Sequence, residues 1–209
     1  MKQVNTTEKN KQHFNKIAAS YDESLAVMIL LLFTIVKAQA KTHTTIFSDI
    51  DDVAQHLPMA SALVLKTLDI GSNDTWGTTI ATYGAIYLTG ASTTWILKHT
   101  TYELRPDGSD RHSLPSGHAM FAFAGATTLR YEYGKKKPWV AVAGYGVATL
   151  VAIDRVRLHR HYTHDVLCGA TIGILSGELC YYVKRHLLKS KKLEVTFSGQ
   201  TISLNYNFE

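Results

Sequence analysis

The chain has 209 residues, a hydrophobic content of 45%, a mean hydropathy of −0.05 and a formal net charge of +5 at pH 7. This length indicates one domain with its own core, and the composition does not by itself demand a membrane. The positive charge suits an anionic lipid surface or an anionic substrate. It does not indicate nucleic acid, because the motifs and loops described below account for the cations and no basic-aromatic binding motif is present.

The first 40 residues predict a polar leader followed by a signal peptide or an N-terminal membrane anchor. Residues 1–24 are polar, and the apolar run 25–36 is followed by Ala38-Gln39-Ala40, a sequence typical of a signal-peptide cleavage site. The leader is long for a signal peptide and the apolar run is short for a membrane span, so both alternatives stay open. Either one exports the chain that follows.

Helix-like apolar stretches with few charges follow the leader. The stretches are 51–70, which is weak, and then 79–97, 117–129, 139–153 and 166–183. Two of them, 79–97 and 166–183, approach the roughly 20 residues that span a bilayer, whereas 117–129 and 139–153 are shorter. Buried helices of a bundle and thinly hydrophobic membrane spans both fit this pattern.

Three short segments between these stretches carry cations and histidines in a fixed order. Their residues are Lys98 and Arg105, then Ser116, Gly117 and His118, then Arg155, His161 and Asp165. A phosphate monoester carries close to two negative charges, and positioned Arg and Lys groups stabilise the charge on its oxygens in the transition state. The segments therefore predict a phosphate-binding cradle.

The histidines of these segments predict catalysis as well as binding. His161 and Asp165 are four residues apart, so on a helix they would lie on one face, where the carboxylate fixes the tautomer of a nucleophilic imidazole. His118 can act as a general acid. Ser116 and Gly117 precede an apolar run and predict a helix start, whose free N–H groups bind anions.

The last segment of the chain, residues 193–209, changes character. Its apolar residues alternate on both sides of Ser198-Gly199-Gln200. This pattern predicts a short C-terminal β-hairpin.

The order and spacing of the three motif segments closely resemble the signature of the type 2 phosphatidic acid phosphatase and vanadium haloperoxidase superfamily, K-x6-R-P, P-S-G-H and S-R-x5-H-x3-D. The resemblance covers residues 98–165. It departs where Asp154 replaces the serine before Arg155, and a carboxylate there could pair with Arg155 or Arg157 without removing a catalytic group. The resemblance implies an all-α bundle of about five or six helices, expected over residues 41–192.

The resemblance also implies a role for each motif residue. The residues expected to hold the phosphate are Lys98, Arg105, Ser116, Gly117 and Arg155. His161 is expected to attack phosphorus, His118 to protonate the leaving oxygen and Asp165 to orient His161. Neither a cofactor nor a metal is expected.

Metal binding is an alternative for the third segment, where His159, His161, His164 and Asp165 fall within seven residues. Histidine and carboxylate suit zinc. The arginines among them oppose a divalent cation and favour an anion, so we expect a phosphate here.

The charge pattern favours membrane spans. Basic clusters lie at 130–137 and 184–192, and if the helices alternate in direction both fall on one side and every motif residue on the other. This is a positive-inside pattern. It predicts a protein of the bacterial inner membrane whose site faces the periplasm. Solvated loops of a soluble bundle remain the alternative.

The expected activity is hydrolysis of a membrane lipid phosphate or pyrophosphate through a phosphohistidine. Candidate substrates are phosphatidic acid, phosphatidylglycerol phosphate, undecaprenyl pyrophosphate and lipid A. The expected partners are this lipid and the membrane, with no nucleic acid and no obligate protein partner. Alternatives are a soluble periplasmic acid phosphatase, a haloperoxidase that holds vanadate, and a non-catalytic phospholipid-binding envelope protein, which would not need His118, His161 and Asp165.

Overall fold

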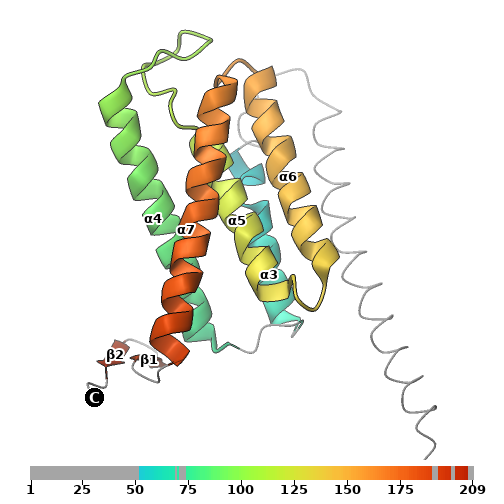
Figure 1. Ribbon diagram of the computed structural model, residues 1–209, viewed down its shortest axis with the longest axis vertical. Helices are drawn as coiled ribbons and strands as arrows, with labels where there is room; N and C mark the ends of the chain where they lie inside the picture. The colour runs from blue at the N-terminus through green and yellow to red at the C-terminus, as the bar shows by residue number, and fades with distance from the viewer. Residues whose placement is uncertain (1–51, 69, 71–73, 190–192, 199–200, 207–209) are drawn as a thin grey trace, which may run out of the picture. The chain divides into compact units, whose positions relative to one another are not determined.

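The computed structural model describes residues 52–68, 70, 74–189, 193–198 and 201–206. The expected leader with its signal peptide or anchor, residues 1–40, lies outside these residues. The described helices are α3 (Leu57–Thr67), α4 (Trp76–Thr101), α5 (Gly117–Tyr133), α6 (Pro138–Arg157) and α7 (Thr163–Lys189). They run side by side in alternating directions (Figure 1), which confirms the predicted all-α bundle.

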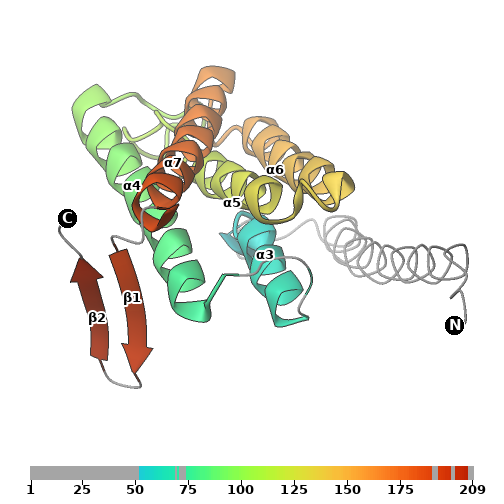
Figure 2. The ribbon, with the colours of Figure 1, turned by 60° about the horizontal axis from the view of Figure 1, so that its bottom comes forward.

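Two strands follow the last helix, in the segment where the sequence predicts a hairpin. They are β1 (Leu193–Ser198) and β2 (Thr201–Tyr206). The strands pair antiparallel, with Leu193 opposite Tyr206 and Ser198 opposite Thr201 (Figure 2).

Helix α5 is the centre of the bundle, in contact with α3, α4, α6 and α7 (Figures 1 and 2). Its buried positions are mostly small, with Ala119, Ala122, Ala124 and Ala126 fully enclosed. Alanine is the best helix former, and its short side chain lets neighbouring backbones come close. Met120, also fully buried, fills part of the remaining space.

Helix α7 packs on α5 through three glycines spaced four residues apart, Gly169, Gly173 and Gly177. A Cβ at Gly169 would lie 2.2 Å from the carbonyl oxygen of Ser116, and one at Gly173 would lie 2.3 Å from that of Met120. At Gly177 it would come within 2.5 Å of an α5 side chain. Only glycine allows the two backbones to approach this closely, as in packed membrane helices.

Ion pairs join α7 to α5 and to the segment before α4, at the end of the bundle opposite the motif residues. Lys184 donates to Asp74 at 2.5 Å and to Glu132 at 3.2 Å, and Arg130 pairs with Glu178. Part of the two basic clusters is therefore neutralised by carboxylates, which the sequence did not predict. Lys184 and Glu132 are largely buried, so losing one partner would leave an uncompensated charge.

Several threonine hydroxyls within the helices donate to a backbone carbonyl one turn earlier. In α4, Thr79, Thr82 and Thr93 donate to the carbonyl four residues earlier at 3.0, 2.7 and 2.9 Å. Thr127 of α5 and Thr149 of α6 do the same at 2.9 and 2.8 Å. Such hydroxyls need no water, so they are tolerated in an apolar environment.

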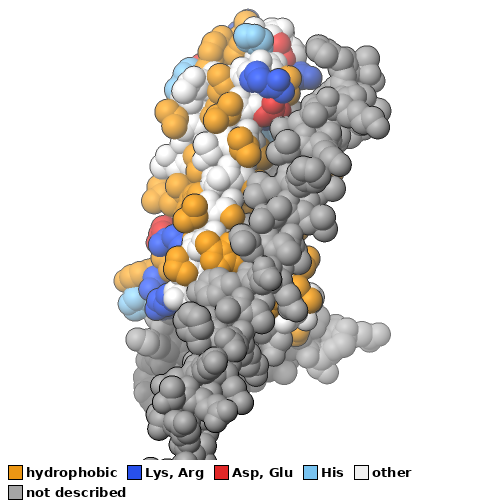
Figure 3. Space-filling model, turned by 90° about the vertical axis from the view of Figure 1, so that its right-hand side faces the viewer, with side chains coloured by type: hydrophobic (Ala, Val, Ile, Leu, Met, Phe, Trp, Pro, Cys, Tyr) orange, Lys and Arg blue, Asp and Glu red, His pale blue; other side chains and the backbone are white. Residues whose placement is uncertain are grey.

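Large apolar side chains cover the outside of the bundle. Leu88 of α4 is 70% exposed and Val142 of α6 is 72% exposed, and Trp76 and Trp95 are exposed on α4. Figure 3 shows apolar side chains along the length of one face, with charged side chains gathered toward its ends. By length and composition, α6 and residues Thr163–His186 of α7 can cross a membrane. This exterior suits lipid better than water.

Candidate active site

The predicted site residues all lie at one end of the bundle. Lys98 is in the last turn of α4, Ser116 caps α5, Arg155 is in the last turn of α6 and Asp165 is in the first turn of α7. Because the helices alternate in direction, the α4–α5 and α6–α7 loops meet at this end, which is uppermost in Figure 1.

His161 is buried, with 3% of its surface exposed. Its Nδ1 lies 3.5 Å from Oδ2 of Asp165, which accepts hydrogen bonds from the Ser113 hydroxyl at 2.5 Å and the Tyr162 backbone N–H at 2.8 Å. His161 precedes α7 by two residues, so the expectation that the pair shares a helix face is wrong. The two meet because Asp165, inside the helix, reaches back to its N-terminal end.

The surroundings of His161 keep its imidazole neutral at pH 7. Burial, together with the positive charges of Lys98, Arg105 and Arg155, lowers the pKa of His161 to about 4, while Asp165 opposes the lowering. A neutral ring is the form that a nucleophile needs.

The α4–α5 loop braces two of the predicted cations. Lys98 Nζ donates to the His112 carbonyl at 2.6 Å, and Arg105 Nε donates to Asp110 Oδ1 at 3.0 Å. The same Asp110 oxygen accepts the His112 N–H at 2.7 Å, which joins the two contacts. Burial lowers the pKa of Lys98 to about 8, and the charge of Arg105 contributes to the lowering.

Arg155, the third cation, is buried at the end of α6. Its carbonyl accepts the N–H groups of Arg160 and His161 at 3.1 and 3.3 Å, so the α6–α7 loop folds back onto the helix end. Asp154, the residue that departs from the family signature, accepts hydrogen bonds from Arg157 at 2.7 and 3.0 Å. This is one of the two pairings considered from the sequence.

Ser116 begins α5, as predicted. Its hydroxyl accepts the Ala119 N–H at 3.5 Å, and its own N–H donates to the Asp165 carbonyl at 2.9 Å. The start of α5 is thereby fixed to the first turn of α7. A Cβ at Gly117 would meet nothing within 4 Å, so the space beside this helix N-terminus is open. Such a terminus suits an anion.

His118 lies in the first turn of α5 and is partly exposed. Its Nε2 is 2.8 Å from Oδ1 of Asp52, a residue outside the three motif segments. Burial lowers the pKa of His118 to about 4, and Arg155 and Arg105 contribute, while Asp52 opposes them. Each of the two predicted catalytic histidines therefore lies beside a carboxylate, in a region with three cations.

Comparison with known proteins agrees with this arrangement. Residues 85–188 match the PAP2 superfamily. The chain carries a PAP2 superfamily domain. The matched residues of the PAP2 domain include every predicted site residue and exclude Asp52.

The PAP2 domain is similar to proteins named as lipid phosphatases. Lipid A 1-phosphatase of Porphyromonas gingivalis is 37% identical over 168 residues, which are 75% of this chain and 37% of that protein. Dolichyldiphosphatase 1 of Dictyostelium discoideum is 29% identical over 147 residues, which are 64% of this chain and 63% of that protein. This chain therefore spans less than two thirds of either relative.

A solved structure has the same fold. It is the crystal structure of a transmembrane PAP2 type phosphatidylglycerolphosphate phosphatase from Bacillus subtilis, with a TM-score of 0.51 and 23% identity. The match covers 82% of this chain and 96% of the other. At this identity it shows the PAP2 fold alone.

Metal binding, the alternative considered for the third segment, would use His159, His161, His164 and Asp165. Among the described residues, one group has ligand atoms that all lie within 4.8 Å of one another, and it consists of Glu103, His164 and Asp165, without His159 and His161. Glu103 and His164 already pair at 2.8 Å. The positive charge of Lys98 acts on this region and favours an anion.

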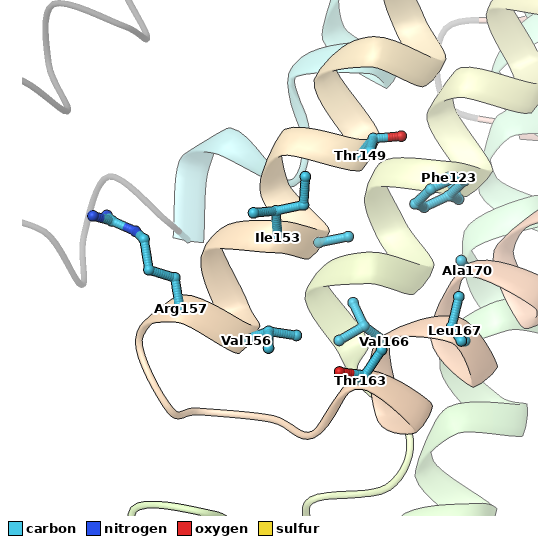
Figure 4. A pocket seen from close by; sticks show the side chains of 10 residues that line it. Phe123, Thr149, Ile153, Val156, Arg157, Thr163, Val166, Leu167 and Ala170 are labelled. Carbon is cyan, nitrogen blue, oxygen red and sulfur yellow. The ribbon is translucent and has the colours of Figure 1, made fainter.

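An apolar groove of about 630 Å³ lies near the end of the PAP2 domain that carries the candidate site. It runs between α6 and α7 over Phe123 of α5, and its lining includes Ile153, Val156, Val166 and Ala170 (Figure 4). Val156 follows Arg155 and Val166 follows Asp165 in the chain, so the groove reaches the end of α6 and α7 at which the site lies.

Two residues of the PAP2 site were missed by sequence reasoning. Ser113 and Asp52 contact their partners across 52 and 66 residues, and no spacing rule marks such long-range contacts. The glycine stripe of α7 could have been found, because its spacing of four residues is a known signal for close helix packing.

Proposed function

We propose that this protein is a metal-independent phosphatase that hydrolyses a phosphate monoester or pyrophosphate of a membrane lipid through a phosphohistidine. The observation that carries the proposal is the buried His161, whose Nδ1 lies 3.5 Å from Asp165 beside Lys98, Arg105 and Arg155. Binding alone would need the cations but not a nucleophile with an orienting carboxylate. This distinguishes an enzyme from a lipid-binding envelope protein.

The first half of the reaction transfers the phosphoryl group to His161. Because Nδ1 faces Asp165, Nε2 attacks phosphorus, and the P–N bond forms as the P–O bond breaks. The leaving oxygen takes the electron pair of that bond and a proton from His118. The three cations hold the equatorial oxygens.

The second half returns the enzyme to its starting state. Water attacks phosphorus and gives a proton to His118, while the P–N bond breaks and its electron pair returns to His161. The products are inorganic phosphate and a lipid alcohol, or a lipid monophosphate where the substrate is a pyrophosphate.

The proton on His118 depends on the substrate. With its pKa at about 4, His118 is neutral in the empty site at pH 7. A bound phosphate brings negative charge next to the ring and favours the protonated form. We therefore expect the catalytic proton to enter together with the substrate.

Three features support a lipid substrate. The exterior of the bundle is apolar, relatives are named lipid A 1-phosphatase and dolichyldiphosphatase 1, and the α6–α7 groove adjoins the cradle. We propose that the groove takes an acyl or isoprenoid chain of the substrate. Lipid A and a polyprenyl pyrophosphate are therefore the first substrates to test.

The distribution of charge supports one orientation in the membrane. The basic residues of the α5–α6 loop and of the end of α7 lie opposite the site. Under the positive-inside rule, the proposed site faces the periplasm of a bacterial inner membrane.

The proposed activity is tested by phosphate release from the detergent-solubilised protein with a chelator present. The panel is lipid A, undecaprenyl pyrophosphate, phosphatidylglycerol phosphate, phosphatidic acid and one water-soluble ester. We expect chelator-resistant release from at least one lipid. Release from the soluble ester alone would indicate an acid phosphatase, and no release from a folded protein would contradict the proposal.

The same panel tests the groove through Ala170→Phe. We expect the added ring to lower kcat/KM for long-chain lipids about tenfold or more and to change it for the soluble ester less than about twofold. Ala85→Phe, at an exposed position of α4, is the matched control. An equal loss on both substrates would show that the groove does not hold the chain.

We expect Lys98 to limit activity at high pH. Only its charged form binds phosphate, so this contribution to kcat/KM is complete below the pKa of about 8 and is lost as the pH rises through it. Lys98→Arg stays charged. The ratio of kcat/KM for the variant to that for the natural protein, in which titration of the substrate cancels, should rise about tenfold per pH unit above 8. A ratio that stays level to pH 10 would contradict this role.

A further inference from the structure

The carboxylate of Asp52 is held against the candidate general acid. Its Oδ1 is 2.8 Å from His118 Nε2, and the side chains are 66% and 18% exposed. The carboxylate thus covers the ring from the solvent side, 66 residues away along the chain.

Contacts to two helices fix the segment that carries Asp52. The Gln55 side chain donates to the Asp52 carbonyl at 2.8 Å, and His56 Nδ1 lies 3.2 Å from the Tyr87 hydroxyl of α4. The His56 ring also packs against Tyr87 and Phe121, with centroid distances of 5.7 and 5.1 Å. The position of the carboxylate over α5 is therefore set by side-chain packing.

Asp52 offsets the positive charges near His118. Arg155 and Arg105 oppose a positive charge on the ring, and Asp52 favours it through both its charge and its hydrogen bond. A general acid must carry a proton in a site that contains three other cations. Asp52 supplies the opposing charge.

This inference rests on the proposed function. We infer that Asp52 is a positioning residue for the general acid: it accepts the Nε2–H of His118 and leaves Nδ1 as the nitrogen that serves the leaving group. As the P–O bond breaks, the oxygen takes the electron pair and the Nδ1 proton, and neutral His118 keeps its Nε2–H bonded to Asp52. In the second half, water returns a proton to Nδ1.

Each of the two histidines would then have its own orienting carboxylate. Asp165 lies against the buried His161, and Asp52 lies against the more exposed His118. A carboxylate that orients an imidazole fixes both its tautomer and its direction.

The test compares two leaving groups in Asp52→Asn. For a dioleoyl phosphatidic acid, whose alkoxide leaves only with a proton, we expect kcat/KM to fall about 10- to 100-fold. For p-nitrophenyl phosphate, whose phenolate leaves without a proton, we expect a fall of less than about threefold. Loss of fold would affect both substrates alike.

Two further variants separate positioning from folding. In a His118→Ala background, Asp52→Asn should cause no additional loss, because the residue acts only through that ring. Asp52→Glu keeps a carboxylate and should retain more activity on phosphatidic acid than Asp52→Asn. Thermal unfolding of each variant reports whether the protein is folded.

Different results would contradict the role of Asp52 and the proposed function. An equal loss on both substrates, or an additional loss in the His118→Ala background, would overturn the inference and leave the proposed function intact. A rise in kcat/KM would also overturn it, since Asp52 would then occupy the leaving-group position. Natural protein that is folded and releases phosphate from neither of these substrates nor from any other lipid of the panel would overturn the proposed function and this inference with it.

Discussion

Replacing His161 with alanine is expected to lower phosphate release about 10⁴-fold or more, because the variant has no nucleophile to form the intermediate. The ring is buried and its Nδ1 faces Asp165, so no other described imidazole occupies the same position. The measurement is trapping of a phosphoprotein from labelled substrate. A phosphohistidine is stable to alkali and labile to acid, and we expect this label on the natural protein and none on the variant.

His159→Asn is the matched control for the loss of an imidazole from the same loop. His159 is exposed and has φ 55°, a backbone conformation that asparagine tolerates. We expect its activity to stay within about twofold of the natural protein, as for a surface substitution away from the site. Label on His161→Ala, or activity within tenfold of normal, would exclude His161 as the nucleophile.

Gly173→Ala is expected to lower the free energy of unfolding by about 1–3 kcal/mol or more, through overpacking. The new Cβ would lie 2.3 Å from the Met120 carbonyl oxygen and 2.9 Å from the Ala124 nitrogen. Both atoms belong to the α5 backbone, so no side-chain rotation relieves the contact. Thermal unfolding in detergent measures the change, and activity should fall with it because α5 and α7 carry the site.

Gly146→Ala is the matched control on α6. A Cβ there meets nothing within 4 Å, and alanine in a helix is favoured over glycine by about 0.5–1 kcal/mol. We expect this variant to be slightly more stable than the natural protein. Similar behaviour of the two variants would show that α5 and α7 are not packed as closely as described.

The helices and the motif residues could be predicted from the sequence because both are local signals. The capping role of Ser116 and the clustering of Lys98, Arg105 and Arg155 follow from residue types and from alternating helix direction. The expected roles of these residues are still predictions. The i, i+4 spacing correctly indicated that Asp165 lies beside His161, but the two do not share a helix face. His161 precedes α7, and the Asp165 carboxylate reaches back to it from inside the helix.

The missed features depend on packing between distant segments. Asp52 reaches His118 only because the segment before α3 rests on Tyr87 and Phe121. The α6–α7 groove exists because both helices pack on α5 and leave space between themselves, which no local pattern encodes. A hydropathy scale also underestimates how well α4 suits an apolar environment. It scores threonine as polar, although the hydroxyl of Thr79 and of similar residues donates to a carbonyl of the same helix.

The two exposed tryptophans of α4 suggest the depth at which the site lies. Trp76 and Trp95 are 19 residues apart, or roughly 29 Å along a helix, and a bilayer has a hydrocarbon core about 30 Å thick. Tryptophans gather at the two membrane interfaces. Lys98 stands three residues beyond Trp95, roughly 5 Å further along the axis. The cradle would then lie in the headgroup layer, so a lipid phosphate could reach it by lateral diffusion without leaving the bilayer.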